Sequence, residues 1–313
     1  MCGIAGQFRF AGDPEPPDAA LAGMVRRGPD ARGVSVLGGA ALGNCRLAVV
    51  DPAGGAQPMA DGDALLTYNG EIHDYREHAV ELRDSGVTLR DESDTEVLLQ
   101  LLRRHGTDAL PTVSGMFAFA FADEGGNRLT LARDPFGIKP LAIREDPDGI
   151  RFASEAGALA DERPRLDLDA LVERMAFQVP LSDRTLFSGI RTLAPGTLLT
   201  ADRDGHVERR RWHEVVFDPD EGPSEEEWAE RMRAVLSRAV RISLRADVPL
   251  GVTLSGGLDS SLVAGLAARH LDVPPVAFTG YFEEGPAYDE REHARRAAAE
   301  AGVRLVEVPI RAA

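Results

Sequence analysis

The 313-residue sequence predicts a chain in two parts, a sandwich of β-sheets covered by helices and then an α/β unit built on a parallel sheet. Two patterns predict this fold class. Over the first two thirds, runs of β-branched, aromatic and small apolar residues are separated by turns rich in glycine, aspartate and asparagine. From about residue 220 onwards, strand-like and helix-like segments alternate, which is typical of parallel strands joined by helices.

The first part is expected to hold several recognisable strands and two helices. The run from Met116 to Phe121 alternates large and small side chains, which predicts a strand packed on both faces with its phenylalanines on one of them. Ser93 and Glu96 form a capping-box pattern at the start of a helix. The expected strands are Gly3 to Phe10, Ala41 to Val50, Ala64 to Tyr68, Gly115 to Ala122 and Arg128 to Ala132, and the expected helices are Asp74 to Asp84 and Ser93 to Gly106.

The second part is expected to begin with a long helix, because Ser224 and Glu227 form another capping-box pattern. Its apolar face is Trp228, Met232, Val235, Ala239 and Ile242. Strands at Val252 to Leu254, Val276 to Tyr281 and Val303 to Val308 should alternate with helices at Asp259 to Leu271 and Glu290 to Ala301. The acidic pair Glu283 and Glu284 should belong to a solvated loop. We therefore expect domains at 2–210 and 224–313, with a linker at 211–223.

The composition excludes some partners. Acidic residues outnumber basic ones by 51 to 35, which gives a formal net charge of −16. We expect no nucleic acid and no membrane partner, because both bind to basic faces. Two cysteines cannot build a disulfide framework, so we expect a reducing, cytoplasmic location. The N-terminus lacks a basic and apolar leader, and no apolar run approaches the ~20 residues needed to span a bilayer.

Cys2 is the first candidate for chemistry. If Met1 is removed, the thiol shares its residue with a free α-amine, whose usual pKa of about 7.7–8.0 leaves much of it neutral near pH 7. One residue then supplies both a nucleophile and a base. The alternative is a small buried packing residue, as most free cysteines are, and we expect that role for Cys45 because it lacks the free amine.

Several motifs follow in order after Cys2. They are Arg27-Gly28-Pro29-Asp30, Arg46-Leu47-Ala48-Val49-Val50-Asp51 with Gly55-Ala56-Gln57-Pro58, Tyr68-Asn69-Gly70-Glu71-Ile72, Ser93-Asp94-Thr95-Glu96, and Arg133-Asp134-Pro135-Phe136-Gly137-Ile138-Lys139-Pro140-Leu141. With the second part, the chain resembles the glutamine-hydrolysing asparagine synthetases of the bacterial B type. The resemblance implies an N-terminal-nucleophile (Ntn) hydrolase fold, a four-layer αββα sandwich with a class II glutamine amidotransferase site. It also implies the start of a PP-loop (adenine nucleotide α-hydrolase-like) synthetase domain.

The resemblance implies a role for several of these residues. Cys2, Asn69 and Gly70 are the implied catalytic residues, since the Asn69 amide and the Gly70 N–H can donate to the oxyanion that forms when the thiolate attacks. Arg46 suits the α-carboxylate of glutamine, because a guanidinium fork binds a carboxylate with two hydrogen bonds. The acidic residues neutralise the ammonium, and a backbone group completes the pocket. The implied glutamine-binding set is Arg46, Val49, Asn69, Gly70, Glu71 and Asp94.

Taken singly, these residues have simpler interpretations. Arg46 could be a surface cation at a strand end, and the pair Asn69-Gly70 is common in hairpin turns. Asp94, in the first turn of a helix, could merely complement the helix dipole. Their order after Cys2 favours the functional interpretation, because each motif comes with its expected context.

The run from Ser255 to Ser261 follows a predicted strand and opens a predicted helix. Glycines and a helix N-terminus let backbone N–H groups approach phosphate, although a plain strand-to-helix turn would also fit. The run resembles the pyrophosphate-binding loop of ATP pyrophosphatases. The resemblance implies that Asp259 helps to hold Mg²⁺ with the pyrophosphate. The implied ATP-binding set is Leu254, Ser255, Gly256, Gly257, Asp259, Ser260 and Ser261.

The whole reaction implied is ATP- and Mg²⁺-dependent amidation of L-aspartate with ammonia from glutamine, without an organic prosthetic group. Its products are asparagine, glutamate, AMP and diphosphate. Another carboxylate acceptor, or a glutaminase half or non-catalytic partner without synthetase activity, stays open. The expected partners are glutamine, ATP and aspartate, with a homodimer or a chain that supplies the later synthetase motifs missing here. Arg26 and Asn44 stand where the family usually has histidine.

Overall fold

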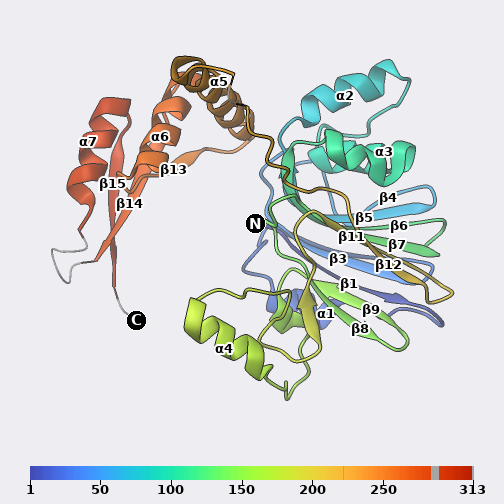
Figure 1. The fold of residues 1–313 in the computed structure, drawn as a ribbon. Coiled ribbons are helices and arrows are strands. Elements are labelled where there is room, and N and C mark those ends of the chain that lie inside the picture. The colour runs from blue at the N-terminus through green and yellow to red at the C-terminus, as the bar shows by residue number, and fades with distance from the viewer. Residues whose placement is uncertain (221, 283–288, 312–313) are drawn as a thin grey trace. The chain divides into compact units, whose positions relative to one another are not determined.

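The chain folds into two compact units, Met1–Val216 and Phe217–Ala313, in a computed structural model that describes residues 1–220, 222–282 and 289–311 (Figure 1). The boundary between the units lies inside the segment 211–223, for which the sequence predicts a linker. Glu283 and Glu284 lie outside the described residues. Among the helices described, none combines the length and the apolar character that a membrane span requires.

Two six-stranded sheets form the centre of the first unit. Their orders are β10-β8-β9-β1-β3-β2 and β12-β11-β7-β6-β5-β4, and neighbouring strands pair antiparallel. The strands are β1 (Gly3–Arg9), β2 (Ala31–Leu37), β3 (Ala40–Arg46), β4 (Met59–Asp61), β5 (Ala64–Ile72), β6 (Gly115–Asp123), β7 (Arg128–Arg133), β8 (Ala142–Asp146), β9 (Gly149–Ala153), β10 (Ile190–Thr192), β11 (Thr197–Asp202) and β12 (Val207–Arg211).

Helices cover the outer face of each sheet (Figure 1). Tyr75–Asp84 (α2) and Asp94–His105 (α3) pack on the second sheet, and Asp18–Gly23 (α1) packs on the first. A third apolar cluster fills the space between the two sheets. The order of layers is therefore helix, sheet, sheet, helix, the αββα sandwich that the family resemblance implies. The remaining helices of this unit are α4 (Leu168–Phe177) and two 3₁₀ turns, η1 (Gly106–Thr112) and η2 (Ala156–Leu159).

Strand β6 shows why the two faces of the second sheet pack differently. Phe117, Phe119 and Phe121 contribute to the core beneath α2 and α3. The alternating small residues, such as Ala118 and Ala120, face the first sheet. Bulky rings therefore fill the gap to the helices, whereas small side chains line the space between the sheets. The predicted alternation along this strand is confirmed.

The strand predicted to run from Ala41 to Val50 instead ends at Arg46. The chain leaves the sheet there because its next backbone N–H groups have other partners. The N–H of Leu47 donates to the sulfur of Cys2 at 3.4 Å, and that of Ala48 donates to the carboxylate of Asp30 at 2.9 Å. The resulting loop forms one wall of the pocket described below.

Two further predictions about local structure need correction. The strand predicted from Ala64 to Tyr68 continues to Ile72, so Asn69 and Gly70 lie inside β5, opposite Ala118 and Phe117 of β6, which excludes the alternative of a hairpin turn. Only half of the capping box at α3 forms. Ser93 Oγ accepts from the N–H of Glu96 at 3.1 Å, but the Glu96 carboxylate pairs with Arg90 at 2.6 Å and does not return to the cap.

The second unit contains a three-stranded parallel sheet of order β13-β14-β15, as the sequence predicts. Helix α5 begins with the complete capping box of Ser224 and Glu227. Of the apolar face predicted on this helix, Ile242 is buried, whereas Trp228 and Met232 are exposed. The elements are α5 (Glu225–Ser243), β13 (Gly251–Thr253), α6 (Leu258–His270), β14 (Val276–Phe282), α7 (Arg291–Ala301) and β15 (Leu305–Ile310).

Candidate active site

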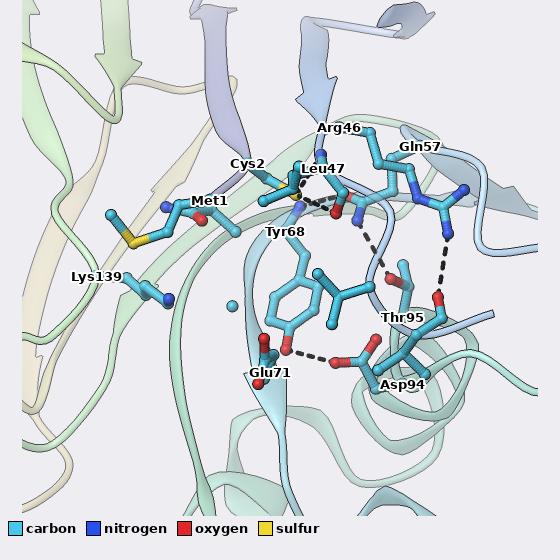
Figure 2. Close-up of a pocket in the computed structure, with 14 residues that line it drawn as sticks. Met1, Cys2, Arg46, Leu47, Gln57, Tyr68, Glu71, Asp94, Thr95 and Lys139 are labelled. Carbon is cyan, nitrogen blue, oxygen red and sulfur yellow. Dashed lines mark hydrogen bonds between the residues drawn. The ribbon is translucent and has the colours of Figure 1, made fainter. Parts of the chain in front are cut away.

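Cys2 lies directly before β1, half-buried in a pocket at one end of the two sheets (Figure 2). Its sulfur accepts a hydrogen bond from the N–H of Leu47 at 3.4 Å and donates to the carbonyl of the same residue at 3.7 Å. Burial raises the pKa of the Cys2 thiol, and the bond to Leu47 opposes that shift. The thiol therefore needs a base to become a nucleophile near neutral pH.

Arg27 and Asp30 hold the two chain segments that meet at the thiol. Arg27 Nε donates to the carbonyl oxygen of Cys2 at 3.0 Å, and its guanidinium also pairs with Glu155 at 3.2 Å. The Asp30 carboxylate accepts from the N–H of Ala48 at 2.9 Å. One turn of the Arg27-Gly28-Pro29-Asp30 motif thus fixes both the N-terminus and the loop that follows β3.

Asn69 and Gly70 present two hydrogen-bond donors at the pocket. The Asn69 side chain is 1% exposed, and its Nδ2 has no hydrogen-bond partner among the described residues. Phe117 of β6 lies opposite Gly70 of β5, but its backbone N–H donates to the Asp134 carboxylate and its carbonyl accepts from the N–H of Asp134. Phe117 and Gly70 are therefore a non-hydrogen-bonded pair, and the Gly70 N–H points away from β6. A Cβ at Gly70 would lie 2.3 Å from the carbonyl oxygen of Met116, which explains the glycine.

Arg46 lines the pocket at the end of β3. Its guanidinium donates to three successive carbonyl oxygens of the following loop, those of Val50 at 3.2 Å, Asp51 at 2.8 Å and Pro52 at 3.3 Å. These bonds place the cation, so Arg46 is not a freely moving surface charge. Val49, on the same loop, also lines the pocket.

Asp94 is buried in the first turn of α3. Its Oδ2 accepts from the Tyr68 hydroxyl at 2.9 Å and from the N–H of Ile72 at 3.1 Å. Burial raises the pKa of Asp94 to about 6, although both hydrogen bonds favour the charged form. Burial also raises the pKa of half-buried Glu71, and the Lys139 cation opposes that rise. The pocket therefore holds two acidic groups ready to receive a cation.

Lys139, which belongs to the motif from Arg133 to Leu141 but has no role implied by the resemblance, lines the same pocket. The buried Asp134 carboxylate holds its turn by accepting from the N–H groups of Phe136, Ile138 and Lys139 at 2.9–3.1 Å. The side chain is 5% exposed, and burial lowers the pKa of its ammonium. The composition could have drawn attention to this residue, because Lys139 is the only lysine among the 35 lysine and arginine residues.

The pocket brings together Cys2 and every residue of the predicted glutamine-binding set. Asn44 and Arg26 are not among its lining residues. Arg26 is exposed, whereas Asn44 is fully buried and donates from Nδ2 to the side-chain oxygen of Gln57 at 3.1 Å and to the carbonyl of Tyr68 at 3.2 Å. The described lining residues are Met1, Cys2, Arg46, Leu47, Val49, Val50, Gln57, Tyr68, Asn69, Gly70, Glu71, Asp94, Thr95 and Lys139.

The predicted ATP-binding residues lie between β13 and the first turns of α6. Gly256 has a φ of +84°, and a Cβ there would lie 2.5 Å from the backbone nitrogen of Ala294 in α7, so the turn requires glycine. Ser255 Oγ and Ser260 Oγ lie 3.1 Å apart, and Asp259 is exposed beside them. The Leu254 side chain is buried in the core of this unit, which leaves its backbone as the part that can approach a ligand.

The remaining predicted residues of this loop are at the helix start. Gly257 is the N-cap of α6, and its carbonyl accepts from the Ser260 hydroxyl at 3.2 Å and from the N–H of Ser261 at 3.0 Å. Asp259 and the serine hydroxyls are oxygen donors, the type that Mg²⁺ prefers. The residues present therefore fit a magnesium ion that is held mainly by the phosphates of a nucleotide.

A helix-covered double sheet with a cysteine at the N-terminal end of a central strand is the fold of the Ntn hydrolase class. The chain belongs to the glutamine amidotransferase domain family, whose model matches residues 1–213. Residues 231–313 match the asparagine synthase family model. Among solved structures, a glutamine phosphoribosylpyrophosphate amidotransferase from B. subtilis shares the fold, with a TM-score of 0.50 at 18% identity, over 98% of this chain and 65% of that one.

Relatives with higher identity are asparagine synthetases. The glutamine-hydrolysing asparagine synthetase 1 of Bacillus subtilis is 33% identical over 284 residues, which cover 90% of this chain and 44% of the relative. The glutamine-hydrolysing asparagine synthetase of Asparagus officinalis is 34% identical over 278 residues, 87% of this chain and 42% of the relative. The chain thus spans less than half of the length of these relatives. The predicted family resemblance is confirmed.

Proposed function

We propose that the first unit hydrolyses glutamine to glutamate and ammonia, with Cys2 as the nucleophile after removal of Met1. One observation carries the proposal. The sulfur of Cys2 shares a single pocket with a guanidinium on Arg46, a buried carboxylate on Asp94 and a buried amide donor on Asn69 that no described residue pairs with. A thiol, an oxyanion donor, a cation and an acid are the groups that amide hydrolysis of a zwitterionic substrate requires.

In this proposal the charges of the pocket orient glutamine. Arg46 and the backbone near Val49 receive the α-carboxylate. Glu71 and Asp94 receive the α-ammonium, and a bound cation would favour the charged form of the Asp94 carboxyl. The side-chain amide then points toward the sulfur of Cys2.

The reaction proceeds through a thioester. The α-amine of Cys2 takes the proton of its own thiol, and the thiolate attacks the amide carbon. The oxygen of the tetrahedral intermediate accepts from Asn69 Nδ2 and the Gly70 N–H. The amine returns the proton to the leaving nitrogen, the carbon–nitrogen bond breaks, and ammonia departs. Water then hydrolyses the thioester to glutamate and restores the thiol.

We further propose that the second unit binds ATP, through Leu254 and the loop from Ser255 to Ser261. Its relatives are named asparagine synthetases, which supports aspartate as the carboxylate that ammonia amidates in the complete protein. Mg²⁺, bound beside Asp259, would neutralise phosphate charge. Incubating the chain with glutamine, MgATP and a panel of carboxylic acids tests this, because asparagine formed with aspartate supports it. Glutamate as the only product would restrict the chain to a glutaminase.

The two cysteines supply a matched test of the nucleophile. Removal of Met1 is first checked by intact mass. Glutamate release should vanish in Cys2→Ala, whereas Cys45→Ala should retain activity, because Cys45 is buried and does not line the pocket. Undiminished activity in Cys2→Ala would overturn the assignment.

A further inference from the structure

Lys139 is a chemical exception in this chain. Arginine occupies every other lysine or arginine position, yet the one lysine is the side chain that is 5% exposed in the pocket of Cys2. An ammonium is a compact charge on a flexible chain, whereas a guanidinium is a wide planar group that is suited to paired hydrogen bonds. A buried lysine in so arginine-rich a sequence therefore marks Lys139 as a positive charge with a role of its own in the pocket.

Four charged groups act on the amine of Met1, and they differ in sign. The thiolate form of Cys2 and the carboxylate of Glu71 favour the charged form of this amine, whereas Lys139 and Arg27 disfavour it. Burial acts in the same direction as the two cations and is the largest influence on the pKa of this amine, which it lowers. Arg46 and Asp94 act on the thiol itself, where Asp94 raises its pKa and Arg46 lowers it.

The two cations are not equivalent. Arg27 is hydrogen-bonded to the Cys2 carbonyl and pairs with Glu155, so part of its charge is neutralised and its position is structural. Lys139 extends into the pocket on the same side as Met1, with Glu71 nearby (Figure 2). The turn that carries Lys139 is clamped by Asp134, so the ammonium is presented from a rigid support.

Removal of Met1 changes where the amine is. It transfers the amino group from an exposed residue to half-buried Cys2, which is deeper in the pocket that Lys139 lines. We propose that Lys139 is a positioning residue of the glutaminase site, whose ammonium keeps the α-amine of Cys2 in the neutral form that accepts the thiol proton. This inference rests on the proposed function for its catalytic consequence, but the charge state of the amine can be measured without it.

The kinetic test compares Lys139→Met, which keeps the apolar stem and removes the charge, with Lys139→Arg, which keeps a charge. In Lys139→Met, the acid limb of kcat/KM for glutamine should move upward by about one pH unit, because the ammonium form of the amine is no longer opposed. Because the amine of the unmodified chain is largely neutral near pH 7, that shift is a loss of several-fold, at most about tenfold, in kcat/KM at pH 7, and it is recovered near pH 9. The acid limb of Lys139→Arg should stay near that of the unmodified chain.

A second measurement separates the inference from the proposed function. Cysteine labelled with carbon-13 gives two sets of signals, because the chain has two cysteines, and Cys45→Ala identifies those of Cys2. The titration midpoint of the Cys2 amine should rise in Lys139→Met. An unchanged midpoint overturns the inference even if the chain is an active glutaminase. A raised midpoint in a chain without glutaminase activity upholds the effect of Lys139 and refutes the proposed function instead.

Discussion

Replacement of Asn69 by alanine should separate catalysis from stability. The side chain is 1% exposed, and its Nδ2 lacks a hydrogen-bond partner among the described residues. An unpartnered buried donor costs a fold about 1–3 kcal/mol, so its removal offsets the packing that alanine loses. We therefore expect the free energy of unfolding of Asn69→Ala to lie within about 1 kcal/mol of the unmodified chain.

The effect on catalysis should be much larger. Loss of one oxyanion donor lowers kcat by about 10²–10³, or about 2.7–4 kcal/mol of transition-state stabilisation. KM for glutamine should change far less, because the donor acts on charge that develops only in the transition state. Steady-state release of glutamate, measured beside urea unfolding of the same sample, gives both quantities.

Asn44 provides the matched control. It is buried behind the same pocket, and its Oδ1 also lacks a partner among the described residues, but its Nδ2 bonds to Gln57 and to the Tyr68 carbonyl, which lose this donor in alanine. Asn44→Ala should therefore lose about 1–3 kcal/mol of stability and retain most of its kcat. The reasoning fails if Asn69→Ala keeps kcat within tenfold of the unmodified chain, or if it unfolds as easily as Asn44→Ala.

Two other predictions concern a buried acid and a strained turn. The folded-state pKa of Asp94, about 6, lies above its ordinary 3.8, so stability falls as pH rises between these values. Asp94→Asn should thus be more stable by about 3 kcal/mol at pH 8, with the gain vanishing toward pH 4, and an equal gain at both pH values in urea unfolding would contradict this. Gly256→Ala should destabilise the second unit by about 1–3 kcal/mol and weaken MgATP binding in calorimetry, because its φ is +84° and a Cβ would approach Ala294. Gly265→Ala is its control, since a Cβ there meets nothing within 4 Å, and equal effects of the two variants would refute the explanation.

The local sequence pattern was sufficient to predict the elements that have a strong hydrophobic periodicity or a helix cap. The alternation along β6, the capping box of α5 and the parallel order of β13, β14 and β15 are all present as predicted. Short strands such as β4 and β10, and helix α4, were not predicted from the sequence. They are three to ten residues long, too short for a clear periodicity, and β10 also takes its partner, β8, from far along the chain.

The sequence by itself determined the residue types and order of the site, because Cys2 and the motifs that contain Arg46, Asn69 and Asp94 can be recognised without a structure. Tertiary structure decided which of their atoms are free to act. Pairing of β5 with β6 placed Asn69 and Gly70 in a strand, where the Asn69 Nδ2 has no hydrogen-bond partner in the described part of the chain. Folding also buried Lys139, the sole lysine, in the pocket of Cys2. Burial strengthens the effect of a charge on the pKa of neighbouring groups, and the spacing of residues in the sequence does not reveal burial.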